Sequence, residues 1–118
     1  MTTFTVKGMK EIHQFYFDNI SHIMVEGPIC TVYRIHGENV SFTKSLSYFE
    51  DVLQGHQFFR IHHNTIVNLK QIAKVKSRGN NHSVFLRDGT ELNISVRKWK
   101  SFNQVFLDRY SKTIHSSN

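Results

Sequence analysis

The chain has 118 residues, which suits one domain with a buried core and is too short for two ordinary domains. Hydrophobic residues make up 39% of the chain and aromatic residues 13%, a composition that excludes general disorder. Cys30 is the single cysteine, which excludes an internal disulfide framework. No apolar run approaches the ~20 residues of a membrane helix and the N-terminus lacks a signal-peptide pattern, so we expect a cytoplasmic protein without a membrane partner.

The net charge of +6 is concentrated in one segment of the chain. Residues 60–100 contain nine Lys or Arg and two acidic residues, a formal charge of +7, whereas the rest of the chain sums to −1. Steering and counterion release favour a polyanion as the partner of such a segment. A merely solvated basic face would have the same composition, so charge alone indicates a nucleic acid without establishing it.

The first 43 residues alternate between short β-rich runs and turn residues. They predict four strands, at 11–17, 20–26, 29–35 and 39–43. The last two of these strands are expected to form a hairpin whose loop is centred on Gly37.

A short helix is predicted after these strands. Leu46, Phe49 and Leu53 recur at helical spacing, and Gly55 stands where a helix would end. Ser47 and Glu50 fit a capping box, which would place the start of the helix at Ser47.

The C-terminal half returns to strands and ends in a helix. Strand character appears at 58–61, and residues 83–87 and 90–95 flank Asp88-Gly89, a strong hairpin signal. Residues 96–110 predict a helix with an apolar stripe, and residues 111–118 are expected to fray. The stripe consists of Trp99, Phe102, Val105 and Phe106. With no repeat or linker, we expect a single domain over 1–118, mainly antiparallel β with one or two short helices.

Eight histidines raise the question of a metal site. His62 and His63 would point to opposite faces of a strand, and the chain has no CxxC or HExxH motif, so we expect no metal. Cys30 belongs to no nucleophile motif, and no GxSxG or Gly-rich phosphate loop is present. We therefore expect no cofactor and no enzyme; the alternative of a Cys/His hydrolase requires a Cys30 thiol of low pKa.

The last predicted helix begins with a cluster of cations. Arg97, Lys98 and Lys100 crowd its first turn, directly after Ser95, a natural N-cap. Cations there cost ~0.3–1 kcal/mol each at low salt, and an external anion such as a phosphate would reverse that cost. Long side chains that bend into water would explain the same residues, so this alternative stays open.

The stretch FFRIHHNTIVNLKQI, residues 58–72, resembles the signature of the LytTR DNA-binding domain. In that signature an aromatic-x-R-x-H pattern leads to a small polar residue and then to [IV]-[IV]-N-x-x-x-I. The matching residues are Phe58, Phe59, Arg60, His62, Ile66, Val67, Asn68 and Ile72. The flanking stretches ISHIMVEG, SLSYFEDVL and VFLRDGTELNISVRKWKSF are similar to the family's opening strand, helix and hairpin with a Ser-x-Arg segment, so the resemblance covers about residues 11–107.

The resemblance implies an elongated arrangement of three small β-sheets and a transcription regulator that contacts successive major grooves of duplex DNA through loops, usually at direct repeats. The loop from Gly27 to Thr31 would enter one groove, His63 and Arg97 would each read a base, and backbone contacts would surround them. The DNA-binding residues implied are Gly27, Ile29, Cys30, Thr31, His63, Asn64, Ser95, Arg97, Lys98 and Lys100.

We expect a different role for each of three further residues of the signature. We expect His62 to form a hydrogen bond within the fold and Asn68 to satisfy buried backbone groups at a turn, whereas Arg60 is either structural or bound to a phosphate. A homodimer on the DNA and a sensor or kinase partner are left open. The main alternative function is a protein-interaction module of the same fold, whose basic surface would bind an acidic partner.

Overall fold

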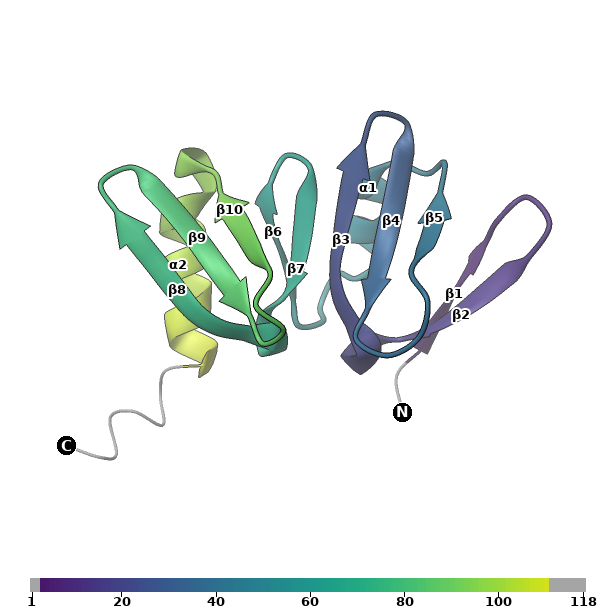
Figure 1. Cartoon of the computed structure of the whole chain (residues 1–118), viewed down its shortest axis with the longest axis horizontal. Coiled ribbons are helices and arrows are strands. Elements are labelled where there is room, and N and C mark those ends of the chain that lie inside the picture. Colours follow the sequence, from purple (N-terminus) through teal and green to yellow (C-terminus); the bar gives the residue numbers. More distant parts are fainter. Residues whose placement is uncertain (1–2, 111–118) are drawn as a thin grey trace. The chain divides into compact units, whose positions relative to one another are not determined.

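The structure is a computed structural model that describes residues 3–110 (Figure 1). The described chain divides into two compact units: unit 1 contains residues 3–60 and 64–71, and unit 2 contains residues 61–63 and 72–110. Ten strands and two α-helices follow one another along these residues. The strands are β1 Thr3–Lys7, β2 Ile12–Tyr16, β3 Ile20–Glu26, β4 Ile29–Arg34, β5 Val40–Phe42, β6 Phe58–His62, β7 Thr65–Asn68, β8 Ile72–Arg78, β9 Asn81–Leu86 and β10 Glu91–Ile94; the helices are α1 Leu46–Val52 and α2 Val96–Tyr110.

The strands form three sheets, as expected. Their orders are β1-β2, β5-β4-β3-β7-β6 and β10-β9-β8. The neighbours pair antiparallel, for example β3 with both β4 and β7. The prediction of a mainly antiparallel β fold with two helices is therefore confirmed. No helix within residues 3–110 has the length and apolar character needed to cross a membrane.

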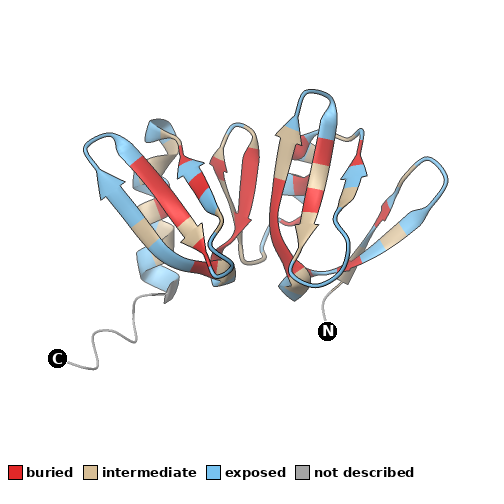
Figure 2. Ribbon diagram, in the orientation of Figure 1, coloured by how far each residue is buried: buried red, intermediate tan, exposed pale blue. Residues whose placement is uncertain are grey.

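The core of unit 1 lies between its sheets and α1. Phe15, Ile23, Val32 and Phe49 are almost or completely inaccessible to solvent, and they belong to one continuous apolar cluster (Figure 2). In β4, Cys30 and Val32 are buried and the residues beside them are not, an alternation typical of a strand with one face on a core. Burial of this apolar surface is the main driving force for unit 1.

Three features of unit 1 differ from the sequence prediction, and one of them is that β7 was not predicted. β1 was not predicted, although its Val6 is fully buried, because a five-residue strand beside the N-terminus has few flanking signals. The predicted start of α1 was wrong. The N-cap is Ser45, whose side chain accepts a hydrogen bond from the backbone N–H of Tyr48 at 3.1 Å. Glu50 instead pairs with Arg60. The predicted N-cap was thus two residues too late, and no capping box forms, because Tyr48 stands at the third helical position.

Unit 2 packs α2 against one side of the β8–β10 sheet. The predicted apolar stripe is confirmed in its central residue, since Phe102 is fully buried. The Trp99 ring stacks on the ring of His82 in β9, with centroids 4.1 Å apart and planes 2° apart. The hairpin at Asp88-Gly89 is also confirmed, but its loop is longer than the two residues predicted. The N–H of Leu86 donates to the carbonyl of Thr90 at 2.8 Å, and in this loop the positive φ belongs to Gly89, at +93°.

The predicted fraying of residues 111–118 falls outside the described residues.

Candidate nucleic-acid interface

The predicted site residues fall into two groups, one in each unit. In unit 1 the turn between β3 and β4 consists of Gly27 and Pro28 alone, and Ile29 already begins β4. Gly27 has φ +57°, a conformation that glycine adopts without strain. Ile29 is exposed, whereas Thr31 is half-buried and its hydroxyl lies 2.8 Å from that of Ser41. The turn and the start of β4 therefore present mainly backbone and the apolar side chains of Pro28 and Ile29 to solvent.

Cys30 does not fit the role predicted for it. Its side chain is 0% exposed, within the apolar cluster of unit 1, so it has no access to DNA. Cys30 faces inward because β4 alternates between the core and solvent. Burial raises the pKa of its thiol from 9.0 to about 11. This shift is opposite to the low pKa that a Cys/His hydrolase requires.

Asn64 lies in the turn between β6 and β7. Its backbone carbonyl accepts the N–H of Val25 at 2.9 Å, which ties the turn to β3. Its side-chain oxygen accepts the hydroxyl of Thr65 at 2.8 Å. Because the side-chain oxygen is engaged, the amide N–H₂ group is the part of Asn64 suited to an anion.

In unit 2 the two signature histidines lie at the end of β6. His63 is exposed and stands in the turn, so its ring lies beside that of His62, with centroids 4.4 Å apart. The prediction that the rings point to opposite faces of a strand was wrong because the strand ends between them. The hydrogen bond expected for His62 is absent at its buried Nδ1, which has no partner among residues 3–110.

The first turn of α2 holds the second part of the unit 2 group. As predicted, Ser95 caps the helix: the N–H of Lys98 donates to the Ser95 hydroxyl at 3.2 Å and to its carbonyl at 3.0 Å. The N–H of Ser95 donates to the carbonyl of Ile61 at 2.9 Å. This bond holds the end of β6 and the start of α2 together, although they are far apart in the sequence.

The cations of this turn have no anionic partner among the residues that the structure describes. Arg97 and Lys100 are exposed and Lys98 is half-buried. Within residues 3–110, none of the three lies within 4.0 Å of a carboxylate. Their charge adds to the positive end of the helix dipole, so the turn is electrostatically prepared for an external anion.

The structure assigns two other signature residues to the fold. Arg60 Nη1 lies 3.0 Å from the Glu50 carboxylate, an intramolecular ion pair that supports the structural role. Asn68 is fully buried; its amide donates to the carbonyl of Ile20 at 2.7 Å, and its oxygen accepts the N–H of Lys70 at 3.0 Å. The expectation for Asn68 is confirmed.

Sequence reasoning missed a row of cations on β8. Lys74, Lys76 and Arg78 are all exposed and alternate along the strand. The stretch IAKVKSR has the two-residue period of a strand, and this signal would have located the row. Among residues 3–110 no group of three or more His, Cys, Asp or Glu could hold a metal ion.

The fold is mainly antiparallel β, and the basic start of α2 is suited to an anionic ligand. The LytTr DNA-binding domain family matches residues 10–107, so the chain belongs to this family. Among solved structures, the chain is similar to the LytTr DNA-binding domain of a Bacillus cereus protein described as a methyl-accepting/DNA response regulator, with a TM-score of 0.73 and 18% identity over 91% of this chain and 97% of that chain. A search of curated proteins found no match.

Proposed function

We propose that the chain is a sequence-specific, double-stranded DNA-binding transcription regulator that contacts successive major grooves through loops. The observation that carries the proposal is the first turn of α2, where Arg97, Lys98 and Lys100 lack an ion-pair partner within residues 3–110. This turn is found in a chain of a DNA-binding domain family. Phosphate contacts would supply affinity there and base contacts specificity.

Each group of residues has a separate role in this proposal. In unit 2, Arg97 reads a base, because a guanidinium can contact guanine through two bonds, and Lys98, Lys100 and Ser95 contact the backbone. His63 reads a second base with a single bond, since a neutral imidazole has one donor and one acceptor.

In unit 1, the turn at Gly27 enters another groove, with Ile29 and Thr31 beside it, and Asn64 donates to a phosphate. Cys30 has no part in the contact, because it is 0% exposed.

The remaining features of the proposal follow from the family and the charge. The family match runs through both units, which supports one DNA-binding domain and not two independent ones. We propose that the operator contains direct repeats bound by two copies of the chain, that a sensor or kinase partner supplies the signal, and that the protein acts in the cytoplasm. We assign it no cofactor and no catalytic step.

The alternative is a protein-interaction module whose basic surface binds an acidic protein. Selection of the purified chain on a random duplex library separates the two functions. The regulator is expected to enrich a repeated short motif. If no motif emerges and binding stays at the non-specific level, the proposal fails and an acidic protein partner is favoured.

A single substitution then tests the base contact of Arg97. Arg97→Ala is expected to weaken binding to the enriched site by about 1–3 kcal/mol and to relax specificity at one position. Arg109→Ala is the matched control, since it removes the same charge from the last turn of the same helix and is expected to leave specificity unchanged. Equal losses on enriched and random DNA would show that Arg97 contacts only phosphate.

A further inference from the structure

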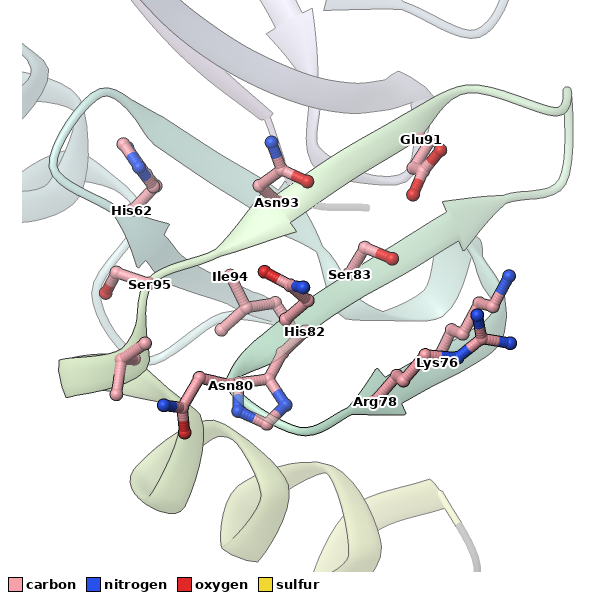
Figure 3. A pocket seen from close by; sticks show the side chains of 12 residues that line it. His62, Lys76, Arg78, Asn80, His82, Ser83, Glu91, Asn93, Ile94 and Ser95 are labelled. Atoms are coloured by element: carbon pink, nitrogen blue, oxygen red, sulfur yellow. The ribbon is translucent and has the colours of Figure 1, made fainter.

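Unit 2 contains a polar pocket, and Ser95 is the one lining residue that it shares with the proposed DNA interface. Its volume is about 640 Å³, within the ~300–1,000 Å³ common for small-molecule sites. Residues of β6, β8, β9, β10 and the start of α2 line it (Figure 3). Sites for apolar ligands are lined mainly by hydrophobic side chains, whereas most side chains here are polar or charged, which favours a polar ligand.

One wall of the pocket is positively charged. Lys76 and Arg78 are two residues apart on β8, so they share one face of the strand, and Figure 3 shows their side chains next to each other. Neither lies within 4.0 Å of a carboxylate of residues 3–110. Cations on an edge strand also prevent unwanted strand pairing, and Lys74, whose Nζ lies 4.5 Å from the centre of the Phe85 ring, fits that role. Lys76 and Arg78 differ from Lys74 because they border a cavity.

Polar groups stand beside this wall. Ser83 is the direct cross-strand partner of both Lys76 and Asn93, so these three side chains lie in one row on the same face of the sheet. Figure 3 shows Asn93 and Ser83 between the cations and His62. The row thus places an ammonium, a hydroxyl and an amide where one ligand can contact all three.

His62 supplies the last observation. Its Nδ1 is buried and has no hydrogen-bond partner within residues 3–110, and an unpaired buried polar atom is costly. The His62 side chain lies on the opposite side of the pocket from Lys76 and Arg78. Because Nδ1 itself is closed to solvent, a ligand in the pocket contacts the accessible part of the His62 ring.

We propose that this pocket binds a small phosphorylated molecule that carries hydroxyl groups, such as a sugar phosphate. The phosphate lies at Lys76 and Arg78, and the hydroxyls reach Asn93, Ser83 and the ring of His62. Charge-assisted bonds to the phosphate provide most of the affinity. The hydroxyl contacts distinguish such a ligand from inorganic phosphate.

The position of the pocket suggests an effect on DNA binding, and this second step rests on the proposed function. Ser95 and Val96 line the pocket and directly precede Arg97 in the chain. A bound phosphate adds negative charge near the cations of the first turn of α2. We therefore expect the ligand to weaken DNA binding, so that the pocket acts as an effector site.

An NMR titration of the isotope-labelled full chain, without DNA, tests the binding step. Ribose 5-phosphate is the probe, and ribose and inorganic phosphate are the comparisons. We expect saturable shifts at His62, Ser83 and Asn93 and binding of ribose 5-phosphate at least about tenfold tighter than of either comparison. Arg78→Gln and Lys76→Gln should each weaken it about tenfold or more, and the matched control Lys74→Gln by less than about twofold.

Several results would overturn the proposal. Absence of saturable shifts, or an equal loss in Lys74→Gln and Arg78→Gln, would show that the pocket selects no such ligand. If ribose 5-phosphate fails to bind but Lys76→Gln weakens binding to every DNA sequence, the cations serve the DNA backbone instead. Binding of ribose 5-phosphate by a chain that selects no DNA motif would leave the pocket standing and reject only the proposed function.

Discussion

Asn68 illustrates how a signature residue serves the fold and not the partner. Its side chain is 0% exposed and joins the carbonyl of Ile20 to the N–H of Lys70. An asparagine can do this because its amide carries both a donor and an acceptor. A buried carbonyl that loses its donor cannot turn to water, so the contact stabilises unit 1.

Asn68→Ala is expected to lower the free energy of unfolding by about 1–3 kcal/mol, because it leaves the carbonyl of Ile20 without its donor. Urea denaturation measures the change. Asn39→Ala is the control: its oxygen accepts the N–H of Arg34 at 3.0 Å in an exposed loop, where water can replace it. Equal losses in the two variants would contradict the role given to Asn68.

Cys30 gives the chain a pH dependence of stability at alkaline pH. The pKa of its thiol is raised from 9.0 to about 11 in the fold because the thiolate is disfavoured by burial. The unfolded chain therefore loses its proton first as the pH rises. The stabilisation is complete below pH 9 and is lost between about pH 9 and 11.

Wild-type protein is expected to lose about 2 kcal/mol more stability than Cys30→Ala between pH 8 and 11. Denaturation midpoints collected over this range provide the comparison. The difference between the two proteins isolates the thiol from the lysines and tyrosines that titrate in the same range. Parallel pH profiles would mean that the Cys30 pKa is not raised in the fold.

Residue roles were predictable from the sequence only where the role depends on residue type and local order. Ser95 was correctly identified as an N-cap, since serine directly before a basic helical run is a local signal. His62 and Cys30 were misjudged, because their environments depend on where β6 ends and which face of β4 is buried. The buried face of β4 is set by an apolar cluster whose residues range from Val6 to Ile66, and such long-range packing leaves no local signal.

Helices and strands were predictable where the hydrophobic periodicity agrees with the turn and capping residues beside it. α2 was predicted correctly because its apolar stripe is wide. The hairpin at Asp88-Gly89 was predicted because Asp-Gly is a strong turn signal. β7 escaped detection: all four of its residues are buried, so it shows no alternation between polar and apolar positions. A strand covered on both faces cannot be distinguished from other buried segments by its period.

Substitutions at the start of α1 distinguish the observed N-cap, Ser45, from the predicted one, Ser47. Ser45→Ala is expected to lower stability by about 1 kcal/mol, because it removes the acceptor for the N–H of Tyr48. Ser47→Ala is the control and should cost less, since within residues 3–110 the Ser47 hydroxyl has one hydrogen bond, a long one of 3.5 Å from Arg60. A larger loss in Ser47→Ala, measured by thermal or urea unfolding, would support the capping box at Ser47.

For the whole molecule, the fold class followed from many weak signals in a consistent order. The short strands, single proline and family-like stretches each have alternatives, but together they agree with one mainly antiparallel fold. The uneven charge indicates an anionic partner, because the excess of positive charge lies in residues 60–100, which contain the start of α2. Charge does not identify a partner by itself, since acidic proteins and DNA attract the same surface.

The central claim is that the chain binds duplex DNA sequence-specifically. The most direct test measures the affinity of the purified chain for its enriched duplex and for a scrambled duplex of equal composition, over a range of salt concentrations. We predict that the enriched duplex is bound at least about 10³-fold tighter at physiological salt and that log K falls linearly with log salt for both duplexes. Equal affinities at every salt concentration would contradict the claim and leave only a basic surface without sequence recognition.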